Sequence, residues 1–142
     1  CKTKMKTSQG KIYPQNMTDK RVAKVKDPQY HGEIRALIRN PPINPKDIIP
    51  MTVDLRIHNQ IREEIPKKIR CQVIMIYENI SKEILDEFKL KRKTISHTNF
   101  DWHVPKQIGK VRIELRLIMA GVTVDPNNFE YNPLELEIQP SH

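Results

Sequence analysis

The residues that could carry chemistry are few, and the first candidates are two cysteines and a short run of histidines. Cys1 and Cys71 are the two thiols among the 142 residues. His97 and His103 flank Asp101 in one stretch of alternating side chains. A metal site needs three or four converging ligands, and six positions along an extended strand span roughly 20 Å. We therefore expect surface histidines here and no metal.

The apolar setting of Cys71 argues against a nucleophilic thiol. Cys71 alternates with Val73 and Met75, so it takes the inward side of a predicted strand. Burial raises the pKa of a thiol and lowers its reactivity. No nucleophile elbow, phosphate-binding glycine loop or zinc-protease motif occurs, and the four glycines are scattered. These observations predict a protein without catalytic residues, without a cofactor and without a small-molecule substrate.

Positive charge gathers in two short clusters of a chain whose net charge is +8. Because only 6% of residues are aromatic and none interleaves with the clusters, nucleic acid is not the expected partner. Point charges of this kind suit anionic headgroups or an acidic protein face. The alternative is a solvated surface of a lysine-rich protein. The predicted basic patch comprises Lys67, Lys68, Arg70, Lys89, Lys91, Arg92 and Lys93.

Alternation of apolar and polar residues predicts the strands that must position these side chains. Strict period two is the pattern of strands with one face in a core and one in water. One run, 69–77, is apolar on both faces, as expected of a central strand. Another places Trp102 on the apolar side, which favours core packing, with an interface anchor as the alternative. The runs occupy residues 34–38, 51–57, 69–77, 94–104, 111–119 and 134–138.

Residues 81–90 are the ambiguous segment. Ile84, Leu85 and Phe88 stand at helical spacing behind Ser81, a residue type that caps helices well. The same residues would also fit a short strand. The spacing favours a short helix or an irregular crossover.

Short strands separated by proline-rich turns are typical of a β-sandwich. Residues 100–115, an aromatic strand followed by a strand of the form Gly-x-aliphatic-x-aliphatic, resemble the late strands of immunoglobulin-like and fibronectin-type modules. The resemblance implies a mainly β, antiparallel sandwich, immunoglobulin-like or transthyretin-like, in residues 33–142. Residues 1–32 are polar and cationic, which predicts an extended basic tether.

Cys1 takes on a specific meaning beside that tether. In bacteria the mature N-terminus of a lipoprotein is a cysteine whose thiol carries lipid. Cys1, Lys2 and the polar residues that follow resemble the N-terminus of mature outer-membrane lipoproteins. The resemblance implies lipidation of Cys1 and stable anchoring at the periplasmic face of a bacterial outer membrane. It also implies a scaffold or binding protein of a secretion or motility machine, with other proteins of that envelope assembly as partners.

The alternative function is a structural module of a larger assembly, such as a capsid, a tail or an organelle complex, with no lipid anchor. Unpaired edge strands would then join neighbouring subunits by strand addition.

For either function, the long connection 121–131 is the preferred partner-binding loop, because long ordered loops are often functional. Its predicted contact residues are Asn127, Asn128, Phe129 and Tyr131. The alternative is that Phe129 and Tyr131 pack on the core of their own domain.

Overall fold

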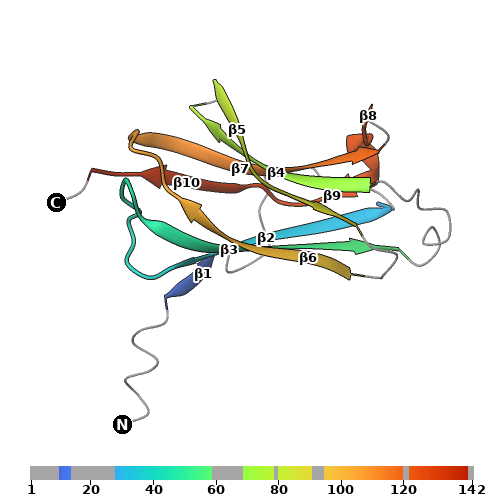
Figure 1. The fold of residues 1–142 in the computed structure, drawn as a ribbon, viewed down its shortest axis with the longest axis horizontal. Coiled ribbons are helices and arrows are strands. Elements are labelled where there is room, and N and C mark those ends of the chain that lie inside the picture. The colour runs from blue at the N-terminus through green and yellow to red at the C-terminus, as the bar shows by residue number, and fades with distance from the viewer. Residues whose placement is uncertain are drawn as a thin grey trace, which may run out of the picture.

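The computed structural model describes residues 10–13, 28–58, 69–78, 80–90, 95–119 and 122–140. Its strands form two stacked sheets (Figure 1). The first sheet has the order β1 (Lys11–Tyr13), β2 (Tyr30–Ile38), β3 (Ile48–Ile57) and β6 (Ile95–His103), and β9 (Phe129–Glu130) also pairs with β2. The second has the order β10 (Leu134–Ile138), β7 (Gly109–Met119), β4 (Ile69–Tyr77) and β5 (Ser81–Lys89), and β8 (Val122–Thr123) also pairs with β7.

The alternating pattern decides which side chains fill the space between the sheets. In β2, β3 and most of β7, every second residue is buried and the residues between them are more exposed. Trp102 enters this core from β6 with 2% of its surface exposed, as core packing predicts. Each buried aliphatic side chain contributes roughly 1.5–3 kcal/mol through the hydrophobic effect. The predicted antiparallel β-sandwich is thereby confirmed.

The chain changes sheet between β3 and β4, between β5 and β6, and between β6 and β7. As a result β3 pairs with β6 in one sheet, while β4, β7 and β10 lie side by side in the other. Crossing of this kind is how immunoglobulin-like sandwiches are connected. The link from β6 to β7 falls within the segment 100–115, whose sequence resembles those modules.

Residues 81–89 form strand β5, so the predicted helix or crossover is wrong there. The pairing of β5 with β4 shifts register between Val73 and Ile74, where Asp86 faces Val73 and Ile84 faces Ile74. Leu85 is therefore the extra residue of a β-bulge. The bulge places Ile84 on the outer face and leaves Leu85 and Phe88 against the core. One inserted residue gives this strand the apolar spacing of a helix.

Two short strands cover the outer edge of β2. β1 pairs antiparallel with residues 36–38, and β9 pairs parallel with Tyr30 and His31. Lys11–Tyr13, which fall within the predicted tether, thus belong to the first sheet. Residues 1–9 and 14–27 lie outside the described residues.

Candidate functional site

The predicted basic patch is only partly within the described residues. Arg70 on β4 and Lys89 on β5 face each other across the ladder, and both are exposed. Arg70 is balanced in part by Glu87, whose Oε1 lies 3.7 Å from Arg70 Nη1. Lys67, Lys68, Lys91, Arg92 and Lys93 lie outside the described residues. The structure brings two members of the patch together and leaves the patch itself a prediction.

The aromatic residues of the 121–131 connection are structural. Phe129 is 8% exposed, belongs to β9, and stacks on Tyr131 with ring centroids 4.9 Å apart. Burial, with a smaller contribution from Glu114, raises the pKa of Tyr131 to about 12. Because these rings pack on the core, the structure favours the alternative of core packing for Phe129 and Tyr131, and their contact with a partner stays a prediction.

The two asparagines of this connection lie in the short 3-10 helix Pro126–Asn128. The Asn127 side chain is exposed, and its backbone N–H donates to Asp125 Oδ1 at 2.9 Å. Asn128 is partly buried, and its backbone carbonyl accepts a hydrogen bond from Gln29 N–H at 3.0 Å. For Asn127 and Asn128 a partner-binding role stays a prediction.

Cys71, the thiol within the described residues, lacks the exposed setting of a reactive centre. Cys71 is fully buried on the inner side of β4, and this burial, with the nearby Asp86, raises the pKa of its thiol. Cys1 lies outside the described residues, so its lipidation stays a prediction. Within the described ranges no three His, Cys, Asp or Glu side chains are grouped as metal ligands.

The feature that sequence patterns missed is the free edge of β6. Val104, just after β6, donates from its N–H to Asp47 O at 2.9 Å and accepts from Lys46 N–H at 3.0 Å. Its backbone groups therefore point toward the β3 side of the sheet. Because these directions alternate along an antiparallel strand, the N–H and C=O groups of His97, Asn99 and Asp101 point away from β3. Among the described residues no strand pairs with that edge.

The two edges of the second sheet, β5 and β10, carry features that hinder the addition of a strand. β5 has its bulge, a row of charged residues and the carboxylate of Asp86 on its inner side, where Thr98 Oγ1 donates to Oδ2 at 2.9 Å. β10 has five residues, follows Pro133, and has Ile138 bridged to Ile43. Bulges, inward charges and short edge strands are how native sheets prevent edge pairing.

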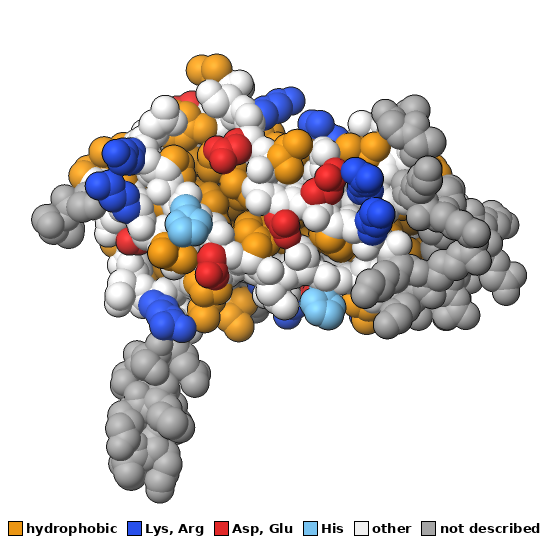
Figure 2. All heavy atoms as spheres, viewed as in Figure 1, with side chains coloured by type: hydrophobic (Ala, Val, Ile, Leu, Met, Phe, Trp, Pro, Cys, Tyr) orange, Lys and Arg blue, Asp and Glu red, His pale blue; other side chains and the backbone are white. Residues whose placement is uncertain are grey.

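β6 has none of these protections. It runs for nine residues in unbroken register with β3, contains no proline, and has Asp101 as its one carboxylate. β6 lies at the front of the lower sheet in Figure 1, and the same view in Figure 2 shows hydrophobic side chains exposed along the middle of this side. Phe100, on the inner side of β6, is one of the partly buried residues that pack against the core. An added strand would cover more of it.

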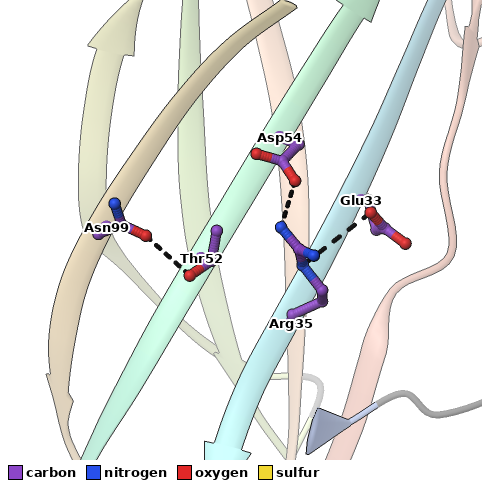
Figure 3. A network of polar contacts seen from close by, with 5 residues as sticks. All are labelled: Glu33, Arg35, Thr52, Asp54 and Asn99. Atoms are coloured by element: carbon purple, nitrogen blue, oxygen red, sulfur yellow. Dashed lines mark hydrogen bonds and ion pairs between the residues drawn. The ribbon is translucent and has the colours of Figure 1, made fainter.

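Polar contacts on the outer face of the first sheet connect β6 to the strands beside it (Figure 3). Thr52 Oγ1 on β3 donates to Asn99 Oδ1 at 2.8 Å, and Figure 3 shows the amide nitrogen of Asn99 turned away from Thr52. One strand further in, Arg35 pairs with Asp54 and lies 4.0 Å from Glu33. These contacts link β2, β3 and β6 across the outer face of the first sheet, beside the free edge.

Comparisons with known proteins do not add a family to this description. No protein-family model matches the chain, and a search of curated proteins finds no match. In the described part of the chain, no helix has the length and apolar character that a membrane span needs.

Proposed function

We propose that this chain is a non-enzymatic binding or scaffold component that receives a partner by strand addition at β6. One observation supports this above the others: the nine-residue edge of β6 is regular and unprotected, whereas the edges of β5 and β10 carry bulges, charges or a bridge. In strand addition, main-chain hydrogen bonds supply affinity and alternate side chains supply specificity.

The partner would pair with the outward backbone groups of His97, Asn99 and Asp101. Its side chains on one face would lie beside Phe100 at the margin of the core. On the other face they would lie beside His97 and Asp101, which are exposed. Such an interface requires no catalytic residue.

Two settings are compatible with this function. In the first, the domain belongs to a cell-envelope assembly and is held there by lipid at Cys1, a proposal that rests on the sequence resemblance. In the second, it is a module of a larger assembly with no lipid anchor, and the edge strand alone supplies the connection.

Site-specific photo-cross-linking tests the function. A photoreactive residue at position 99 is compared, in cells that produce the protein, with the same residue at Glu137, an exposed position on the edge strand β10. We expect a discrete cross-linked species from position 99 and none from position 137. No product at position 99, or equal products at both positions, would contradict strand addition at β6.

A further inference from the structure

We propose that the strand added to β6 is β6 of a second copy of this chain, in an antiparallel pair about Asn99. The proposal rests on the proposed function and names its partner. Asn99 is the central residue of β6. A two-fold axis through it pairs His97 with Asp101 of the second copy, and by symmetry Asp101 with His97.

This register is the one that makes the edge complementary to itself. Each imidazole then lies beside a carboxylate, to which one of its ring N–H groups can donate a hydrogen bond, and such complementary cross-strand pairs stabilise a sheet. Moving the register by two residues in one direction would place His97 against His103, and in the other direction would place it against Asn99. A slip of one residue would set outer-face side chains against inner-face ones.

The same register suits the inner side of the edge and the backbone. Phe100 would lie opposite Thr98 of the second copy, which would cover a ring that is only partly buried here. The N–H and C=O groups of His97, Asn99 and Asp101 would pair with their counterparts. Because the contact is two-fold symmetric, it closes on itself and gives a dimer. The two first sheets would then form one continuous sheet.

Sedimentation velocity over a concentration series tests the pairing, with the full chain carrying Cys1→Ser so that this thiol forms no cross-link. The wild-type sequence is expected to dimerise. His97→Asp would set two carboxylates against each other twice per dimer, and we expect the dissociation constant to rise on the order of tenfold. Adding Asp101→His restores an imidazole opposite each carboxylate, and the double variant should return to within about threefold of the parent.

His58→Asp makes the same charge change at an exposed histidine beyond the end of β3, and it should leave dimerisation unchanged. A chain that stays monomeric at every concentration would overturn the proposal. So would an unaffected His97→Asp variant or a double variant no better than the single one. Thermal unfolding of each variant shows whether it remains folded.

A covalent test of the register uses Asn99→Cys in the same background. Directly opposed hydrogen-bonded residues have Cα atoms about 5.5 Å apart, which lies within the range of disulfides. We expect a disulfide-linked dimer in a glutathione buffer, whereas Thr52→Cys, one strand further in, should stay monomeric. A monomeric chain whose position 99 cross-links to a different protein would reject the self-pairing and leave the proposed function standing.

Discussion

The Phe129 ring is expected to hold the sandwich together where β9 meets β2, and its removal tests that role. Phe129 pairs with Tyr30 in the parallel ladder and packs against Tyr131. A Cβ built on Gly32 would lie 3.1 and 3.2 Å from two carbons of the Phe129 ring and 2.8 Å from Leu115 Cδ1. The ring therefore occupies space that an ordinary side chain at position 32 would need.

These contacts set the expected magnitudes. Phe129→Ala removes a buried ring and should lower the free energy of unfolding by roughly 3–5 kcal/mol. Gly32→Ala overpacks the same place and should cost about 1–3 kcal/mol. In the double variant the added methyl group enters the space that the ring has left. The double variant should therefore lose about 1–2 kcal/mol less free energy of unfolding than the sum of the losses in the two single variants.

Urea unfolding followed by Trp102 fluorescence measures all four chains. For a domain of this size, the loss at Phe129→Ala corresponds to a fall in Tm of about 6–20 °C. A loss below about 1 kcal/mol would mean that the ring contributes little to the fold, as expected of a partner-binding residue. Strict additivity of the two single variants would show that Gly32 and Phe129 do not share one packed space.

Other predictions follow from the buried and paired groups. The pKa of Tyr131 is about 12 in the folded chain against an ordinary value of 10.0, so the unfolded chain loses its proton first. Stability should fall by about 1.4 kcal/mol per pH unit between these two values, and Tyr131→Phe should remove that part of the decline in urea titrations. The buried thiol of Cys71 should react with a thiol reagent only at the rate of unfolding; fast labelling of a folded Cys1→Ser chain would contradict its burial. Arg35→Met should cost about 1 kcal/mol by leaving Asp54 without its cation, and Arg56→Met should cost less; equal losses in thermal unfolding would refute the ion pair's contribution.

The strands that bury one face could be predicted from the sequence, because burial of one face makes apolar and polar residues alternate. Ile34, Val53 and Ile113 each stand in such a run, and all three are buried. β5 could not be predicted, since the bulge at Leu85 breaks the period and an edge strand needs little apolar surface. β1 and β9 have three and two residues, and they are strands because β2 offers them an edge. No local pattern of so few residues predicts that pairing.

The candidate site was missed for a related reason. A free edge depends on which strand ends a sheet, and this depends on the order of all strands in the fold. In the sequence, the spacing of His97 and Asp101 along one strand argues against a metal site and indicates no other role. Their relation about Asn99 matters only once β6 is known to be an edge strand.

Residue-resolved amide exchange in β6 tests the central claim most directly. The amides of Thr98 and Phe100 point toward β3 and should be protected at every protein concentration. The amides of His97, Asn99 and Asp101 should exchange rapidly in dilute protein and become protected as the chain associates. Slow exchange of these three amides in monomeric protein, or continued fast exchange in the associated form, would contradict strand addition at β6.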